Sequence, residues 1–187
     1  MQEQVPAAHA LGNEKSDQIV AWELDDKETE ARDAELMALF YQVVHDDLFC
    51  LSLPPTGYVS DLKKALGDAF TVTGYFLKDR LIGFRASLHY EGTTHAYMVG
   101  FSREHNREYK LYQRMLYDYV HEGIEVGSRL LDMGRTALEI KSCLGATPVQ
   151  YFLHIRFRYP CVHALIKPVF NRLSPAAWEP RNPFSTT

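Results

Sequence analysis

Three consecutive segments with strand periodicity, joined by two short turns, constrain the fold of this chain most strongly. Phe70–Leu77, Leu81–Tyr90 and Thr93–Phe101 are rich in β-branched and aromatic residues, and their hydrophobic pattern has a period of two. They are separated by Lys78-Asp79-Arg80 and by Glu91-Gly92, and connections this short join antiparallel neighbours. The sequence therefore predicts a three-stranded antiparallel meander.

Helical patterns flank the meander on both sides. Ahead of it, Ile19–Leu24 is a short apolar patch that can form a strand, and helices are predicted at about Glu28–Leu48 and Val59–Leu66. Behind it, Ser102–Glu108 has the composition of a polar connector, and Tyr109–Val126 carries the clearest helical pattern of the chain. Two helices are thus expected before the meander and one directly after it.

The segment from residue 129 to residue 158 predicts a strand–helix–strand unit. Its parts are a short buried strand at Arg129–Met133, a helix at Arg135–Leu144 and a final strand at Pro148–Arg158. A meander followed by such a unit predicts the α/β (mixed α+β) class: a central mixed sheet with helices on both faces.

The length of the chain and the positions of its polar and proline-rich segments suggest one folded domain with two appended ends. A chain of 187 residues is long enough for one core of ordinary size. We expect a polar leader, partly disordered, over residues 1–27, the domain over residues 28–160, and a proline-rich extension packed on it over residues 161–187. Within that extension only Val162–Leu173 has a helical pattern, which Pro168 would kink.

Composition narrows the class of protein. Hydrophobic residues make up 46% of the chain and charged residues 24%, as in soluble globular proteins, and no apolar run is long enough to span a bilayer. The N-terminal residues are polar and acidic, unlike a signal peptide. The three cysteines have no paired spacing, and Cys50 and Cys143 resemble small buried residues, so a reducing cytoplasm is the expected location.

Charge is unevenly distributed. Residues 1–35 contain three Lys/Arg against ten Asp/Glu, whereas residues 135–187 contain seven against two, within a net charge of −4. An acidic chain argues against nucleic acid as a partner. The basic C-terminal third could contact an anionic ligand, or the oppositely charged ends could simply pack together.

One lysine occupies the apolar side of its predicted helix. Ala137, Ile140, Lys141 and Leu144 follow helical spacing, while Arg135, Glu139 and Ser142 fall on the other side. A buried ammonium must extend to solvent, pair with a charge or contact a ligand. Lys141 is therefore either a functional residue or a lysine that extends to solvent at a helix C-terminus, where positive charge is favourable.

The order of these elements, with particular residues in place, resembles the GNAT-type N-acyltransferase fold. The residues that carry the likeness are Gly74-Tyr75-Phe76, Ile82-Gly83-Phe84, Ala96-Tyr97-Met98-Val99-Gly100-Phe101, Leu111-Tyr112, Gly127, Asp132-Met133-Gly134-Arg135-Thr136, Lys141, Leu144-Gly145-Ala146 and Arg181-Asn182-Pro183-Phe184. More narrowly, the chain resembles the C-terminal half of Fem-like proteins, which carry two such domains.

This resemblance implies a reaction and a place for it. It implies transfer of an acyl or aminoacyl group to an amine, in a cleft where the strands at Thr93–Phe101 and Arg129–Met133 splay apart. It assigns to Lys141 the stabilisation of negative charge on the tetrahedral intermediate. Members that use acetyl-CoA have a glycine-rich turn for the pyrophosphate. Here Ser102–Glu108 stands at that place and contains no glycine, which departs from the pattern of those members. The resemblance implies acyl-CoA as a candidate co-substrate, and no permanently bound cofactor is expected.

Several further residues allow both a functional and a structural interpretation. Asp132 could be a general base or a helix N-cap, and His95 a proton acceptor or a buried core histidine. Arg135 could hold an anionic donor or pair with Glu139, and Tyr112 could face the cleft or the core. Together with Arg103 and Arg107, Arg135 and Tyr112 are the residues expected to contact the donor.

Metal binding is not expected, because His45-Asp46-Asp47 and the pair His154 and His163 lack ligand spacing. The partners expected are a small-molecule acyl donor, an amine acceptor, and a second GNAT-like domain or a second copy of the chain. Three alternatives stay open: an N-acyltransferase, a non-catalytic half-domain that binds a ligand or protein, and a truncated fragment.

Overall fold

The computed structural model describes residues 18–45 and 54–152, together with residues 158, 162, 166, 178, 179 and 181. The chain divides into two compact units, residues 1–134 and residues 135–187, and each is described by itself. Most of the expected leader (1–27) and of the C-terminal extension (161–187) lies outside the described residues, so these two boundaries stay predictions. So does the helix expected within Val162–Leu173.

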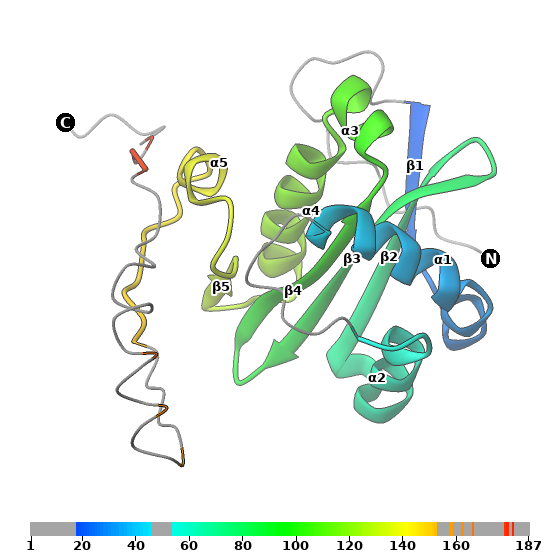
Figure 1. Cartoon of the computed structure of the whole chain (residues 1–187), viewed down its shortest axis with the longest axis horizontal. Helices are drawn as coiled ribbons and strands as arrows, with labels where there is room; N and C mark the ends of the chain where they lie inside the picture. Colours follow the sequence, from blue (N-terminus) through cyan, green and yellow to red (C-terminus); the bar gives the residue numbers. More distant parts are fainter. Residues whose placement is uncertain are drawn as a thin grey trace. The chain divides into compact units, whose positions relative to one another are not determined.

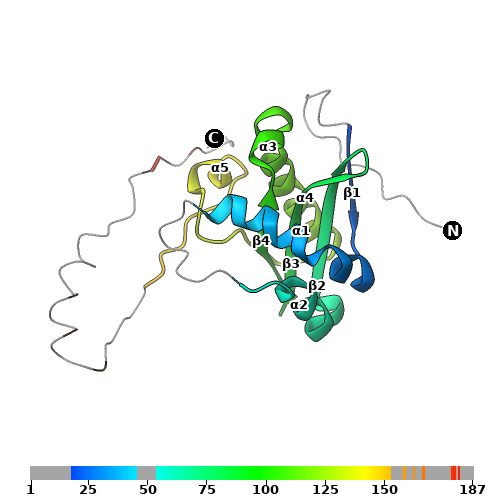
Figure 2. The ribbon, with the colours of Figure 1, turned by 45° about the vertical axis from the view of Figure 1, so that its right-hand side comes forward.

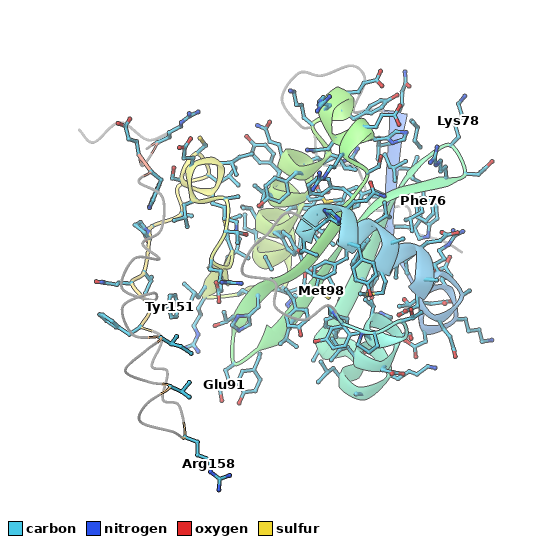
Figure 3. The ribbon with its side chains drawn as sticks, in the orientation of Figure 1. Phe76, Lys78, Glu91, Met98, Tyr151 and Arg158 are labelled. Atoms are coloured by element: carbon cyan, nitrogen blue, oxygen red, sulfur yellow. The ribbon has the colours of Figure 1, made fainter. Side chains whose placement is uncertain are left out.

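The first unit is built on a five-stranded mixed sheet (Figure 1). Its strands are β1 (Ile19–Glu23), β2 (Phe70–Leu77), β3 (Arg80–Tyr90), β4 (Thr93–Phe101) and β5 (Leu130–Asp132), arranged in chain order across the sheet. Neighbours from β1 to β4 are antiparallel, and β5 lies parallel to β4. The predicted meander and the mixed α/β class are confirmed. Lys78 and Glu91 occupy the two turns of the meander, at opposite ends of the sheet (Figure 3).

Helices cover both faces of this sheet (Figures 1 and 2). On one face lie α1 (Asp26–Val44) and α2 (Tyr58–Leu66), which is followed by the short helix η2 (Gly67–Ala69). On the other face lie α3 (Arg103–Tyr109) and α4 (Leu111–Glu125). Separate apolar clusters fill the two sides: one joins Leu36 and Met37 of α1 to Phe84 and Met98, and the other joins Leu111 and Met115 of α4 to Tyr75.

Two aspartates begin the helices of the first face. Asp25 accepts a hydrogen bond from the Glu28 backbone N–H at 2.7 Å, and the Glu28 carboxylate accepts one from the Asp25 N–H at 3.0 Å. This capping box starts α1 two residues ahead of the predicted Glu28. Asp33, buried within α1, accepts hydrogen bonds from the backbone N–H groups of Gly57 and Ser60, so one helix caps the next.

The segment Ser102–Glu108, predicted to be a polar connector, is mostly helical. The Ser102 hydroxyl accepts a hydrogen bond from the His105 N–H and caps α3. Lys110 then adopts a left-handed conformation, with φ of 54°, and separates α3 from α4. The predicted helix at Tyr109–Val126 therefore begins as a new helix at Leu111.

Helix α1 crosses β4 at Gly100. A Cβ atom at this position would lie 2.6 Å from the Phe40 backbone nitrogen and 2.9 Å from the Leu39 carbonyl carbon. Backbone cannot move aside as a flexible side chain can, so glycine is required for α1 to approach the sheet this closely.

A β-bulge at Tyr97 changes the face to which β4 side chains point. Met98 pairs with Ala86 and Ala96 pairs with Ser87, so Tyr97 is one residue extra. Beyond the bulge, Val99 and Phe101 pack in the α4-side cluster, whereas Tyr97 contacts Tyr58 of α2. The sequence reading that placed His95, Tyr97, Val99 and Phe101 on one face is wrong for this reason.

In the second unit the predicted helix Arg135–Leu144 is shorter than expected. Helix α5 spans Leu138–Ser142, because Ala137 adopts a left-handed conformation with φ of 53°. Lys141 is only 6% exposed. Ser142, predicted to face solvent, is buried, and its hydroxyl accepts a hydrogen bond from the Arg181 N–H at 2.8 Å.

Two further predictions for this unit are wrong. Cys143, expected to be buried, is exposed. The described residues 148–152 of the predicted final strand are not in a strand, and Val149, Tyr151 and Phe152 expose their side chains. The segment was predicted to be a strand, but within the described residues no neighbouring strand pairs with it. Among the helices that the structure describes, none has the length and apolar character needed to cross a membrane.

Candidate functional site

The most distinctive backbone feature of the first unit is the junction of β4 and β5. The two strands pair only at Thr93, Thr94 and His95, opposite Leu130, Leu131 and Asp132. Within the described residues, β4 continues from Ala96 to Phe101 with no strand on this edge. The strands therefore part after His95, and the backbone N–H and C=O groups along this edge of β4 remain outside any ladder.

His95 and Asp132, two of the predicted catalytic residues, meet where the strands part. The His95 Nδ1 atom lies 3.2 Å from Asp132 Oδ2, and the two side chains are 35% and 40% exposed. The other carboxylate oxygen of Asp132 accepts a hydrogen bond from the Gly134 N–H at 2.9 Å. Asp132 does not cap α5, whose first helical residue is Leu138.

The chemistry of this pair permits proton transfer. A carboxylate at Nδ1 favours the imidazole tautomer that carries its hydrogen there, which leaves Nε2 able to accept a proton. The carboxylate also stabilises the imidazolium that forms. His95 is half-buried and joined to a carboxylate, so the alternative of a fully buried core histidine does not describe it.

Two tyrosines join α2 to the bulge of β4 on the same side as His95. The hydroxyls of Tyr58 and Tyr97 lie 2.6 Å apart, and the ring of Tyr97 packs edge-on against Phe70. Burial, reinforced by the hydrogen bond with Tyr58, raises the pKa of Tyr97 to about 12. The Tyr97 phenol therefore stays neutral at physiological pH.

The bulge itself is held from the opposite side by Tyr119 of α4. Its buried hydroxyl lies 3.0 Å from the Ala86 carbonyl oxygen and 2.8 Å from the Met98 carbonyl oxygen, so it bridges β3 and β4 where their register shifts. Burial raises the pKa of Tyr119 well above its ordinary value.

The residues predicted to contact a donor lie on both units. Arg103 and Arg107 are exposed and four positions apart on α3, and the Arg103 Nε donates to the Gln42 carbonyl at 2.6 Å. Tyr112 of α4 is half-buried beside Phe101, and its burial raises its pKa to about 12. In the second unit, Arg135 is exposed. Glu139, the expected partner of Arg135, instead pairs with Arg181 at 3.2 Å.

Comparison with known proteins adds the family. Residues 14–142, more than half of the chain, match the family model described as the acetyltransferase (GNAT) domain. The chain belongs to the GNAT acetyltransferase family. GNAT acetyltransferases use acetyl-CoA as co-substrate. No curated protein matches the chain.

Solved structures share the GNAT fold with this chain at low identity. An aminoglycoside acetyltransferase from an uncultured soil metagenomic sample, in complex with sisomicin, is 15% identical with a TM-score of 0.54, covering 78% of this chain and 98% of its own. A second such enzyme, also from soil, is 17% identical with a TM-score of 0.54, covering 74% and 98%. A protein from Clostridium acetobutylicum described as a predicted acetyltransferase, solved with acetyl-CoA, is 10% identical with a TM-score of 0.58, covering 74% and 96%.

Sequence reasoning missed a buried polar network on the α4 side of this GNAT sheet. Glu122 of α4 contacts Arg85 and Ser87 of β3 and accepts a hydrogen bond from the Thr71 hydroxyl of β2 at 2.9 Å. Arg85 Nε donates to the Tyr75 hydroxyl at 3.1 Å, and that hydroxyl donates to Asp118 at 2.6 Å. The available signal was the alternation of Arg85, Ser87 and His89 along β3, which places three polar side chains on one face.

Charge pairing keeps this network ionised. Burial alone would raise the pKa of the Glu122 carboxyl, but the Arg85 charge and the hydrogen bonds from Ser87, Arg85 and Thr71 lower it below its ordinary value. Removing one member of such a buried pair typically costs about 3–5 kcal/mol, because the other charge is left without a partner.

Proposed function

We propose that this chain is an N-acetyltransferase that transfers the acetyl group of acetyl-CoA to an amine, with His95 as general base and Asp132 as the residue that orients it. The observation that carries the proposal is the His95–Asp132 contact at the point where β4 and β5 part. Family membership supports the donor, and the neighbours solved with acetyl-CoA and with an aminoglycoside support a thioester and an amine as the reactants.

In the proposed reaction, the amine nitrogen attacks the thioester carbonyl carbon, and a C–N bond forms as the carbonyl becomes an oxyanion. His95 Nε2 accepts the proton that the amine loses, while Asp132 holds the Nδ1 hydrogen and stabilises the imidazolium. Collapse of the intermediate breaks the C–S bond, and the coenzyme A sulfur leaves and takes up a proton. The products are an acetamide and the free thiol.

The unpaired edge of β4 supports a place for the donor. Backbone N–H and C=O groups along an open strand edge can bind an extended molecule that contains amides, in the manner of strand addition. The pantetheine arm of coenzyme A is such a molecule, and its length would extend from the thioester toward α3. Arg103 and Arg107 are then proposed to interact with its phosphates, with Tyr112 and Arg135 as further donor contacts.

Lys141 is proposed to stabilise the oxyanion, as the family resemblance implies, and its burial supports a role beyond solvation. An ammonium aimed at a developing oxyanion can lower a barrier by about 3 kcal/mol. Lys141→Met should therefore lower turnover by about 100-fold, and Lys141→Arg tests whether charge alone suffices. Unchanged turnover in Lys141→Met would exclude the catalytic role.

The decisive experiment measures donor binding and transfer separately. Thermal unfolding with acetyl-CoA should show stabilisation, about 2.7 kcal/mol at 100 times the dissociation constant. Thiol release is then followed with a panel of amines that includes an aminoglycoside, a polyamine and a lysine peptide, with acetylated product verified by mass spectrometry. His95→Gln should bind acetyl-CoA as the wild type does and transfer it slowly.

The results separate the alternatives. Stabilisation without transfer to any amine would favour the ligand-binding half-domain. No stabilisation by any thioester would favour another donor, such as the aminoacyl group implied by the Fem-like resemblance. The Fem-like grouping, a second GNAT-like domain or homodimer, and a cytoplasmic location stay predictions.

A further inference from the structure

The buried network around Glu122 has no assigned role in the proposed reaction. Four side chains from β2 and β3 lie around this one carboxylate: Thr71, Arg85 and Ser87 contact it directly, and His89 Nε2 lies 3.4 Å from Glu122 Oε1. Ser87 is fully buried and Arg85 is 8% exposed.

The network continues from His89 to the strand junction. His89 Nδ1 lies 3.1 Å from the Thr94 hydroxyl, and the Thr94 hydroxyl lies 2.7 Å from the Ser128 hydroxyl. Thr94 is fully buried on β4, and Ser128 lies two residues before the start of β5. Polar contacts therefore extend from Glu122, near the C-terminal end of α4, to Ser128, just ahead of β5.

The ionised Glu122 sets the direction of these hydrogen bonds. A carboxylate next to Nε2 favours the imidazole tautomer with its hydrogen on that atom, so His89 Nδ1 is an acceptor. The Thr94 hydroxyl then donates to His89 and accepts from Ser128. Each hydroxyl in this segment has one consistent role.

The end of the network lies next to the proposed catalytic pair. Thr94 pairs with Leu131, and one residue further along, His95 pairs with Asp132. With only three residues, β5 has few ladder hydrogen bonds to fix its register, so contacts outside the ladder carry more weight. These include the Thr94–Ser128 contact, and the Arg129 N–H bond to the Gly92 carbonyl and the Ser128 N–H bond to the Gly123 carbonyl, both at 2.8 Å. The Arg129 guanidinium also donates to the Glu91 carbonyl at 3.1 Å.

We propose that Thr94 and Ser128, held through His89 by Glu122, are positioning residues that fix the register of β5 and so hold Asp132 against His95. The kinetic consequences of this inference rest on the proposed function. The claim that these contacts fix the register of β5 does not. The network acts through Asp132 and touches no substrate.

The kinetic test uses a matched pair at one position. Thr94→Val keeps the β-branched shape and removes the hydroxyl, whereas Thr94→Ser keeps the hydroxyl. We expect kcat to fall about 10- to 100-fold in Thr94→Val, as small misplacements of catalytic groups do, with an unchanged KM for acetyl-CoA. Thr94→Ser should keep wild-type turnover. Thr73→Val, the same substitution on β2, is the structural control, because Thr73 lies outside the described contacts of Glu122, β4 and β5.

A double-mutant cycle tests whether the effect passes through Asp132. If Thr94 acts by positioning Asp132, Thr94→Val should change kcat little in an Asp132→Asn background. Equal losses of kcat in Thr94→Val and Thr73→Val, or additive losses with Asp132→Asn, would overturn the proposal.

Crystal structures of the two Thr94 variants provide a readout that does not need activity. We expect the distance from His95 Nδ1 to Asp132 Oδ2 to exceed hydrogen-bonding range in Thr94→Val and to stay near 3.2 Å in Thr94→Ser. An unchanged distance in Thr94→Val would refute the positioning role even if the protein transfers acetyl groups. A lengthened distance in a protein without transferase activity would support positioning while the proposed function fails.

Discussion

His95 of β4 and Asp132 of β5 are 37 positions apart in the chain, yet His95 Nδ1 lies 3.2 Å from Asp132 Oδ2. The parallel ladder of β4 and β5 brings them together at its last pair. Both side chains are more than a third exposed, so a reactant can approach them.

Asp132→Asn should lower kcat for acetyl transfer by about 10²- to 10⁴-fold. The amide keeps the hydrogen bond from the Gly134 N–H but can no longer stabilise an imidazolium at His95. Steady-state kinetics with acetyl-CoA and an accepted amine measure the change. Asp68→Asn, an exposed site on η2, is the control, and equal turnover in both variants would remove Asp132 from the proposed mechanism.

Alanine at two glycines should change stability in opposite directions. Gly100→Ala forces a Cβ against the α1 backbone and should cost about 3 kcal/mol of unfolding free energy. Gly123 lies inside α4, where an added Cβ meets nothing within 4 Å, so Gly123→Ala should add about 0.5–1 kcal/mol through helix propensity. Urea unfolding measures both, and a tolerated Gly100→Ala would contradict the close crossing of α1 and β4.

Asp33→Ala should lower the unfolding free energy by about 2 kcal/mol. Its carboxylate accepts hydrogen bonds from two backbone N–H groups at the start of α2, which alanine leaves without a partner. Asp33→Asn should cost less, because the amide oxygen can still accept. Glu35→Ala, which removes an exposed pair with Arg32, should change stability by less than about 0.5 kcal/mol in the same urea titration.

Glu122 should make stability depend on pH in the acid range. The pKa of Glu122 in the folded protein lies below its ordinary value of 4.5, so the folded state stabilises the ionised carboxylate more than the unfolded state does. Its contribution is fully present above about pH 5 and is lost as the pH falls through the folded pKa. Unfolding free energies from about pH 7 to about pH 3 should therefore fall less steeply in Glu122→Gln than in the wild type.

A graded variant checks the cause of this pH dependence. Ser87→Ala removes one of the hydrogen bonds that lower the pKa of Glu122, so its slope should lie between those of the wild type and Glu122→Gln. Identical slopes in all three proteins would show that Glu122 does not titrate as its surroundings imply.

The strands of the meander were predictable because local signals agree with the final fold. The period of two in β2, β3 and β4, together with two short turns, placed their ends to within one residue. Helix α3 was missed because its only strong signal is the single capping residue Ser102, and its end depends on the left-handed Lys110. Conformations of this kind are set by packing that no short window of sequence contains.

The candidate site was partly predictable. Asp132 was identified from its place at a strand end, and His95 from its residue type and the alternation along its strand. Their contact depends on the register of a parallel pair, which periodicity does not specify. Glu122 was missed because a charged residue on a helix ordinarily faces solvent. Here polar side chains of β2 and β3 form a complementary surface beneath α4. Such a match between distant segments exists only in three dimensions.

The bulge at Tyr97 has a consequence for how β4 tolerates variation. Along an ordinary half-buried strand, every second residue faces the core and tolerates fewer substitutions. In β4 this alternation has one phase before the bulge and shifts by one residue after it. Thr94 and Ala96 before the bulge share a side with Val99 and Phe101 after it, so even-numbered and then odd-numbered positions contact α4. Deleting Tyr97 would give β4 a single phase and leave the remaining side chains on their present faces, whereas adding or removing a residue elsewhere in β4 would exchange the two faces for part of the strand.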